Sequence, residues 1–280
     1  MHIPILLFSP HSRKPHLPPS TPSLILFFLT ILPTSTHPSQ TLTKPPLPVY
    51  CLDRPTEPTP LLREAHSRVE TRWGGSLEYA SVDVTNTVAL NSVIGSIADC
   101  NSRLDGAVVA AGIQQITPAC EYTAEDTRKM LDVNYTGAFM TSTAAARQMF
   151  KYRCRGSICL IASMSGSVAN KGLLCPVYNS SKAAVVQLAR NLAMEWSPIR
   201  ANGTGGIRVN CLSPGHIMTP MVQKNLEEVP GLRQKWESEN MMGRLAHTRE
   251  FKSAGLFLLS RASSFMTGNN LTIDGGHTAW

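Results

Sequence analysis

A tyrosine and a lysine four residues apart are the side chains in this sequence best suited to acid–base chemistry. Tyr178 and Lys182 have the spacing that places two side chains on one face of a helix. A tyrosine hydroxyl has a pKa of about 10 and is a poor base at neutral pH. A nearby ammonium stabilises the phenolate, so the pair predicts proton exchange with an alcohol or a carbonyl. The pair alone is a weak signal, because many surface helices carry it by chance.

Polar side chains elsewhere strengthen this interpretation. Ser163 follows a predicted strand, at the edge where α/β sheets hold their ligands, and its hydroxyl is suited to hold a substrate oxygen against Tyr178. Ser165 competes for that role, because it lies 13 rather than 15 residues before Tyr178. Asn134 lies inside a predicted long helix, where an amide is mildly unfavourable. It either anchors a water in a proton relay or is a polar helix residue without a role.

An alternation of strands and helices from residue 48 onward is expected to position these side chains. Apolar runs predict strands over 49–52, 77–82, 104–111, 157–162, 207–212 and 271–273. Helical spacing predicts helices over 86–101, 123–150, 176–196 and 248–261. Strands of continuous apolar character between helices indicate a parallel sheet with helices on both faces. We therefore expect one domain over residues 48–280.

Several short motifs follow one another in order in this region. They are Asp83-Val84, Ala110-Ala111-Gly112, Asn134, Ser163-Met164-Ser165-Gly166, Tyr178-Asn179-Ser180-Ser181-Lys182, Pro214 to Thr219 and Asp274-Gly275-Gly276. Together they resemble the short-chain dehydrogenase/reductase family, most of all its fungal polyol and ketose branch of arabinitol and mannitol dehydrogenases and sorbose reductases. The resemblance implies a Rossmann-type, doubly wound parallel sheet. It also implies hydride transfer between a nicotinamide and a secondary alcohol or ketone, with a polyol/ketose pair such as D-arabinitol and ribulose as the expected substrate.

The resemblance also implies catalytic roles for four residues. Tyr178 is the expected acid/base, and Lys182 is expected to lower its pKa and to hold the nicotinamide ribose. Ser163 is expected to orient the substrate oxygen, and Asn134 to support a proton relay. We prefer Ser163 to Ser165 because the polyol branch of the family carries a longer loop before the tyrosine.

The implied cofactor is NAD or NADP, with NAD slightly favoured. Asp53 ends a strand where the family sets this choice, and a carboxylate there binds a ribose 2′-hydroxyl and repels a 2′-phosphate. Arg54 follows directly and would tolerate NADP. The remaining cofactor contacts implied by the resemblance, beside Tyr178 and Lys182, are Asp83, Val84, Gly112, Ile217 and Thr219. Thr219 is also a suitable N-cap for a helix that begins at Pro220, and the neighbouring His216 either reaches the pocket or serves packing.

Residues 1–47 break the pattern. All 19 glycines lie at or after Gly74, and the first acidic residue is Asp53. The strand, glycine-rich loop and helix with which the family cradles a pyrophosphate therefore have no counterpart here. The apolar run 24–32 could mimic the missing central strand, but the Pro-rich residues after it do not suit a turn plus a helix. We interpret 1–47 as disordered, targeting-like or a gene-model artefact, and 48–280 as an incomplete Rossmann domain with exposed strand edges.

Composition narrows the classes of function. The net charge of +7 is scattered and aromatic residues make up only 6% of the chain, which argues against nucleic-acid binding. The nine residues of the apolar run 24–32 are too few to span a membrane as a helix. The seven cysteines form no C-x-x-C pair, so we expect no metal site and a reducing, cytoplasmic compartment. A homodimer or homotetramer is implied by the resemblance. The alternative is that the protein is a non-catalytic relative of this family, which cannot bind the cofactor because its phosphate-binding loop is missing.

Overall fold

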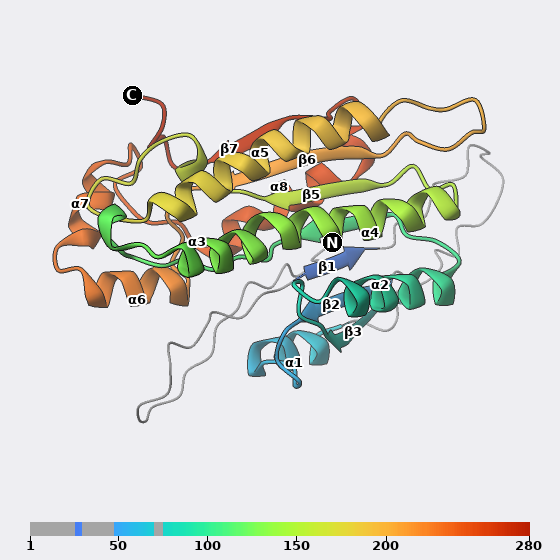
Figure 1. The fold of residues 1–280 in the computed structure, drawn as a ribbon, viewed down its shortest axis with the longest axis horizontal. Helices are drawn as coiled ribbons and strands as arrows, with labels where there is room; N and C mark the ends of the chain where they lie inside the picture. The colour runs from blue at the N-terminus through green and yellow to red at the C-terminus, as the bar shows by residue number, and fades with distance from the viewer. Residues whose placement is uncertain (1–25, 30–47, 70–74) are drawn as a thin grey trace.

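A seven-stranded sheet with the strand order β3-β2-β1-β4-β5-β6-β7 forms the centre of the computed structural model (Figure 1). The structure describes residues 26–29, 48–69 and 75–280. Its strands are β1 (Leu26–Leu29), β2 (Pro48–Asp53), β3 (Ser76–Ser81), β4 (Gly106–Val109), β5 (Ser157–Ile161), β6 (Arg208–Pro214) and β7 (Asn270–Ile273). All neighbouring pairs are parallel except the two pairs that involve β1.

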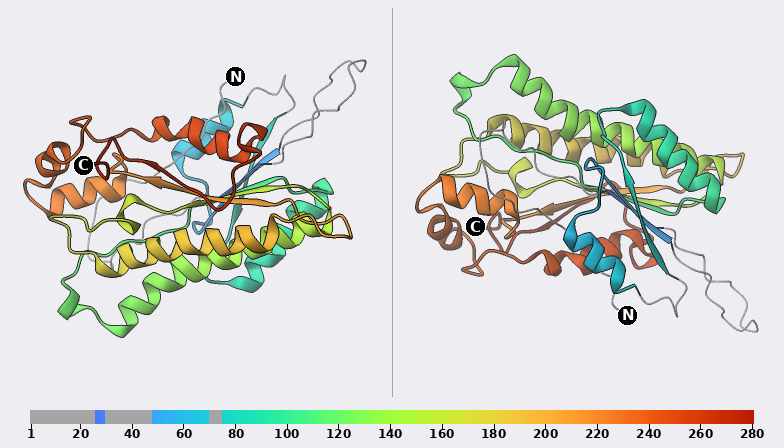
Figure 2. Two further views of the ribbon diagram at one scale, coloured as in Figure 1. Left: turned by 90° about the horizontal axis from the view of Figure 1, so that it is seen from above. Right: turned by 90° about the horizontal axis from the view of Figure 1, so that it is seen from below.

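Helices cover both faces of the sheet, as the sequence predicted (Figure 2). The helices are α1 (Pro60–Ser67), α2 (Thr87–Asn101), α3 (Ala124–Leu131), α4 (Ala138–Lys151), α5 (Pro176–Trp196), α6 (Pro220–Glu228), α7 (Leu232–Ser238) and α8 (Lys252–Leu259). Helices α2, α4 and α5 lie on one face, whereas α1 and α8 lie on the other. The Rossmann-type, doubly wound architecture is confirmed.

Each face of the sheet buries its own apolar cluster. On the side of α2, α4 and α5, the side chains of Ile94, Met149 and Ile158 are fully buried. On the opposite side, Cys159 of β5 and Leu258 of α8 are fully buried in a second cluster. Because side chains alternate along a strand, two buried faces need the continuous apolar runs that the sequence shows. This packing fixes the carboxyl ends of the strands, where the site lies.

The central strand β1 comes from the proline-rich N-terminal segment, which differs from our expectation of an incomplete sheet. Leu26 pairs with Leu52 and Leu29 with Val49 on one side, while Phe27 pairs with Val108 on the other. The prediction of exposed edges on β2 and β4 is therefore wrong, because β1 pairs with both of them. An antiparallel strand satisfies the same backbone groups as a parallel one. The interpretation of the rest of residues 1–47 lies outside the described residues.

Several element boundaries also differ from the predictions. The helix predicted over 123–150 is interrupted by a π-helix, η3 (Asp132–Gly137), which separates α3 from α4. The strand predicted over 104–111 is shorter, and helix α8 is shorter than the predicted 248–261 because 3₁₀ turns flank it. Helices α1 and α7 lie in stretches where we predicted none.

No helix in the described ranges is long and apolar enough to cross a bilayer.

Proline at the centre of β1 tests whether this strand completes the sheet. Replacing Phe27 with proline removes a backbone N–H in a strand that has neighbours on both sides. We expect the Phe27→Pro variant to lose about 1–3 kcal/mol of unfolding free energy, the cost of a buried backbone group left without its partner, measured by urea denaturation. Phe27→Leu keeps the backbone donor and is the matched control. Equal stability of the proline variant and the parent would show that β1 is dispensable.

Candidate active site

The carboxyl ends of the parallel strands bring the predicted site residues to one edge of the sheet. Asp53 ends β2, Ser163 lies two residues after β5, and Gly215 directly follows β6. Helix α5 carries Tyr178 in its first turn, with Lys182 one turn later. A proline in the first turn of α5 favours the start of this helix, because its fixed φ suits that position and no donor is lost there.

Ser163, Tyr178 and Lys182 come together as predicted from the sequence. A hydrogen bond links Ser163 to Tyr178. The ammonium nitrogen of Lys182 lies 5.8 Å from the centroid of the Tyr178 ring. Lys182 is only 4% exposed, and its Nζ donates to the carbonyl of Ile161 at the end of β5, over 2.9 Å. The strand end therefore holds the lysine beside the tyrosine.

Burial sets the protonation of this pair. Burial raises the pKa of Tyr178 to about 12, and the hydrogen bond from Ser163 opposes that rise. Burial also lowers the pKa of Lys182 to about 8, because an ammonium is costly away from water. We expected Lys182 to lower the pKa of Tyr178, but in this structure the effect of burial is larger. Tyr178 packs within an apolar cluster that includes Leu173 and Val222, which explains its desolvation.

Asn134 lies in the π-helix η3 and is completely buried. Its Oδ1 accepts from the backbone N–H of Ile113 at 2.8 Å, and its Nδ2 donates to the Ile113 carbonyl and to Ser181 Oγ at 3.0 and 2.9 Å. The amide therefore ties the loop after β4 to helix α5. The Asn134 amide is linked to Tyr178 through Ser181, which donates to the Tyr178 carbonyl. A π-bulge often marks a functional position, and here it breaks the helix at Asn134.

Sequence reasoning missed Ile113 and Ser181 as the partners of Asn134. Ser181 precedes Lys182 and accepts from Asn134 while it donates to the carbonyl of Tyr178. A signal for Ser181 was present, because it lies within the same motif as Tyr178 and Lys182. Ile113 acts through its backbone, so its side-chain type carried no signal.

The two candidate serines have different surroundings. Ser163 contacts Tyr178, whereas Ser165 is buried and pairs with Asn170 at 2.8 and 3.0 Å. Ser163 also caps the short 3₁₀ helix η4 (Met164–Gly166) by accepting from the backbone N–H of Ser165. This arrangement favours Ser163 over Ser165 as the residue that meets a substrate oxygen.

The predicted nicotinamide end is shaped by residues around Lys182. A Cβ at Gly112 would lie 3.3 Å from Lys182 Nζ, so glycine keeps this wall open. Ile217 is nearly buried and forms a strand-like bridge with Ala246. Thr219 caps α6 by accepting from the backbone N–H of Val222 at 3.3 Å, as its alternative role predicted. The chemistry of the donors fits a nicotinamide riboside, because the Lys182 ammonium lies beside Gly112, which has no side chain to fill that place.

The predicted adenine end lies at the ends of β2 and β3. Asp53 is 2% exposed, and one of its oxygens accepts from the backbone N–H of Arg54 at 2.7 Å. Asp83 accepts from both the backbone N–H and the hydroxyl of Thr85. Val84 is buried and packs closely on η3, where a Cβ at Gly137 would lie 2.7 Å from Val84 Cγ2. Asp53 and Asp83 thus lie at the edge of the sheet where doubly wound folds hold a dinucleotide.

Strand β1 lies between the predicted adenine and nicotinamide ends, where the resemblance implies a loop that binds the pyrophosphate. The structure differs from this expectation. Leu26 begins β1 beside Leu52, so the chain enters β1 at the carboxyl edge instead of leaving it there. A parallel strand at this position would lead into a loop and a helix N-terminus, which bind phosphate through their N–H groups. The described residues at this edge of β1 therefore provide no such cradle.

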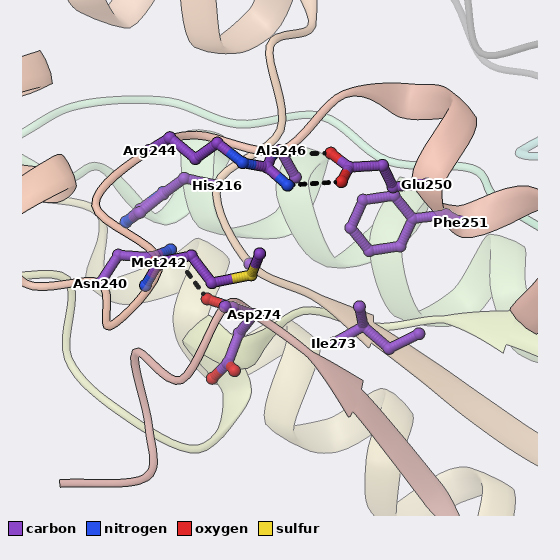
Figure 3. A pocket seen from close by; sticks show the side chains of 11 residues that line it. His216, Asn240, Met242, Arg244, Ala246, Glu250, Phe251, Ile273 and Asp274 are labelled. Atoms are coloured by element: carbon purple, nitrogen blue, oxygen red, sulfur yellow. Dashed lines mark hydrogen bonds and ion pairs between the residues drawn. The ribbon is translucent and has the colours of Figure 1, made fainter.

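The small pocket in Figure 3 lies between two of the predicted motifs, because Gly215 and His216 line it together with Asp274 and Gly275. It has a volume of about 60 Å³, well below the roughly 300–1,000 Å³ of pockets that hold drug-sized ligands. His216 lines it and stacks on Trp236 with ring centroids 3.6 Å apart. Burial and the nearby His277 lower the pKa of His216 to about 3. His216 therefore has a packing role in this structure. No group of three or more metal-ligating side chains exists within the described ranges.

Comparisons with known proteins agree with this geometry. A family model described as "Enoyl-(Acyl carrier protein) reductase" matches residues 56–278. The short chain dehydrogenase/reductase notP' of Aspergillus versicolor is 41% identical over 233 residues, covering 83% of this chain and 79% of the relative. The ribulose-forming D-arabinitol 2-dehydrogenase of Candida albicans is 36% identical over 208 residues, covering 74% of this chain and 72% of the relative.

The fold is also shared with solved structures. A crystal structure of NAD⁺-bound xylitol dehydrogenase superposes with a TM-score of 0.67 and 29% identity, covering 77% of this chain and 85% of that chain. Together with the family match and the convergence of Ser163, Tyr178 and Lys182, these similarities identify the enzyme class. The chain belongs to the short-chain dehydrogenase/reductase family of NAD(P)-dependent oxidoreductases.

Proposed function

We propose that this oxidoreductase interconverts a polyol and its ketose, such as D-arabinitol and ribulose, with Tyr178 as the acid/base. The convergence of Ser163, Tyr178 and Lys182 carries the proposal, because a hydroxyl, a phenol and an ammonium meet at one edge of the sheet. The similarity to a D-arabinitol dehydrogenase and to a xylitol dehydrogenase supports the polyol assignment. A bound nicotinamide would accept the hydride in the oxidation and donate it in the reduction.

Residues of the chain would bind the substrate oxygen and transfer the proton. Ser163 holds this oxygen by a hydrogen bond, and Tyr178 exchanges a proton with it. Lys182 is buried and charged at neutral pH, so it favours the phenolate of Tyr178 when that proton leaves. Lys182 would also hold the nicotinamide ribose. Asn134 holds the loop at Ile113 and helix α5 at Ser181, and we propose that it also supports a proton relay.

We assign the remaining cofactor contacts to residues at the carboxyl edge of the sheet. Asp53 would bind the adenosine ribose, Asp83 and Val84 would contact the adenine, and Gly112 would leave room beside Lys182. Ile217 and Thr219 would contact the carboxamide end. The position of the Asp53 carboxylate at the end of β2 supports a preference for NAD over NADP.

A direct test combines cofactor binding with turnover. We expect the purified 280-residue chain to bind NADH or NADPH in calorimetry and to oxidise D-arabinitol faster than a primary alcohol such as ethanol. Binding of neither cofactor would overturn the proposal and leave the non-catalytic alternative. Binding without turnover of any polyol or ketose would overturn the substrate class alone.

Asp53 provides a prediction about cofactor choice. Replacing it with serine removes the carboxylate that would repel a 2′-phosphate. We expect the Asp53→Ser variant to shift the ratio of NADPH to NADH affinity upward by about tenfold, which corresponds to roughly 1.4 kcal/mol. Asp83→Ser is the matched control. Because Asp83 would contact the adenine, which both cofactors share, its loss should lower the affinity for NADH and for NADPH alike. An unchanged ratio in Asp53→Ser would remove Asp53 from the choice.

Compartment and assembly belong to the same proposal. All seven cysteines are free, which supports a reducing compartment, and we infer that the protein acts in the cytoplasm. We also infer a homodimer or homotetramer, as the family resemblance implies. Size-exclusion chromatography with light scattering tests the assembly, and a monomer at micromolar concentration would contradict it.

A further inference from the structure

The hydroxyl of Ser163 belongs to a buried network of polar side chains that leads away from Tyr178. Ser163 Oγ lies 3.1 Å from Ser165 Oγ, within hydrogen-bond distance. Ser165 Oγ in turn lies 2.8 Å from Nδ2 and 3.0 Å from Oδ1 of Asn170. Ser165 and Asn170 are 6% and 8% exposed, so water competes little for these hydrogen bonds.

The network continues to the residue before α5. Asn170 Nδ2 lies 3.8 Å from Cys175 Sγ, and the thiol donates to Asn179 Oδ1 over 3.2 Å. Burial raises the pKa of Cys175 to about 11, so the thiol is neutral at physiological pH. Asn170 is therefore held on one side by Ser165 and on the other by the start of the helix that carries Tyr178.

Backbone packing keeps this network close to the catalytic helix. A Cβ at Gly166 would lie 2.8 Å from the backbone nitrogen of Ala183 and from the carbonyl carbon of Lys182. Only glycine allows η4 to approach α5 this closely. The turn between Ser163 and Asn170 therefore packs directly against the helix segment that begins at Tyr178.

From these contacts we propose that Asn170 and Ser165 are positioning residues, which hold the Ser163 hydroxyl in hydrogen-bond contact with Tyr178. This inference rests on the proposed function, because it adds partners to the serine of that site. Neither residue is placed against substrate or cofactor. They act by removing the rotational freedom of the Ser163 hydroxyl, which a hydroxyl without fixed partners retains.

The pKa of Tyr178 reports this positioning. The hydrogen bond from Ser163 lowers that pKa, so a Ser163 hydroxyl that turns away leaves Tyr178 with a higher pKa. The titratable groups facing Tyr178 within the described ranges are Cys175 and Lys182. Loss of Asn170 raises the pKa of Cys175 further, so this thiol stays neutral. Loss of Asn170 leaves the hydrogen bond from Lys182 Nζ to the Ile161 carbonyl in place.

The test uses Asn170→Ala, Ser165→Ala and the double variant. We expect Asn170→Ala to lower kcat about 3- to 10-fold, the range of one hydrogen bond, with KM changed less than about twofold. The pH profile of kcat should shift to higher pH. The double variant should be no slower than the slower single variant, because the two residues act in series. Ser167→Ala, at an exposed neighbouring position, should match the parent.

A second measurement does not depend on turnover. In NMR of isotope-labelled tyrosine, with Tyr178→Phe used for assignment, Tyr178 should begin to titrate at higher pH in Asn170→Ala than in the parent. Urea denaturation establishes that the variants are folded. An unchanged Tyr178 titration in folded Asn170→Ala, or additive losses in the double variant, would overturn the inference. A parent without polyol turnover would instead overturn the proposed function, while the titration would still decide the inference.

Discussion

Replacement of Tyr178 by phenylalanine is expected to lower kcat/KM by about 10²- to 10⁴-fold, the usual contribution of a general acid/base. The variant lacks only the hydroxyl that exchanges a proton with the substrate oxygen. The ring stays within the same apolar cluster, so packing is retained. Steady-state rates for polyol oxidation and ketose reduction provide the measurement, and both directions should fall alike because one proton is transferred in each.

A matched tyrosine separates chemistry from structure in this experiment. The Tyr122 hydroxyl donates to the carbonyl of Gln115 over 2.9 Å, so Tyr122→Phe loses one structural hydrogen bond without touching the proposed chemistry. We expect its kcat/KM to stay within about threefold of the parent, since one neutral hydrogen bond contributes about 1 kcal/mol. Equal losses in Tyr122→Phe and Tyr178→Phe would show that both act through the fold.

The features that sequence reasoning predicted correctly depend on local patterns. Helix α5 begins and ends at the predicted residues, because Pro176 suits its first turn and apolar side chains recur at helical spacing up to Trp196. The i, i+4 spacing of Tyr178 and Lys182 then placed both on one face of that helix. The strands that flank the site were recognisable because both of their faces are buried, so their apolar runs are continuous.

The features that could not be predicted from the sequence depend on contacts between segments that are distant along the chain. The direction of β1 is decided by its pairing with β2 and β4, and an apolar run of four residues carries no information about direction. The π-helix at Asn134 is set by the hydrogen bonds to Ile113 and Ser181, which no local propensity encodes. The pKa of Tyr178 follows from its burial, and the spacing to Lys182 alone suggested the opposite direction.

Substitution of Lys182 by methionine should separate activity from stability. Methionine fills a similar volume without charge, so we expect kcat/KM to fall at least about 100-fold through loss of the group that favours the phenolate. The same change should stabilise the fold at pH 7. A pKa lowered from 10.5 to about 8 corresponds to a burial cost on the order of 3 kcal/mol. The lost hydrogen bond to Ile161 offsets about 1 kcal/mol of this.

The pH dependence of this stability difference identifies its cause. Between pH 8 and 10.5 the unfolded chain binds a proton on Lys182 that the native protein lacks, so this group makes the parent more stable as pH rises. The advantage of Lys182→Met, expected to be about 2 kcal/mol at pH 7 from these two opposing contributions, should therefore shrink across that window. Urea denaturation at pH 7 and pH 9.5 measures it, with the exposed Lys171→Met as the control. A Lys182→Met protein less stable than the parent at pH 7 would show that the contacts of the ammonium outweigh its desolvation.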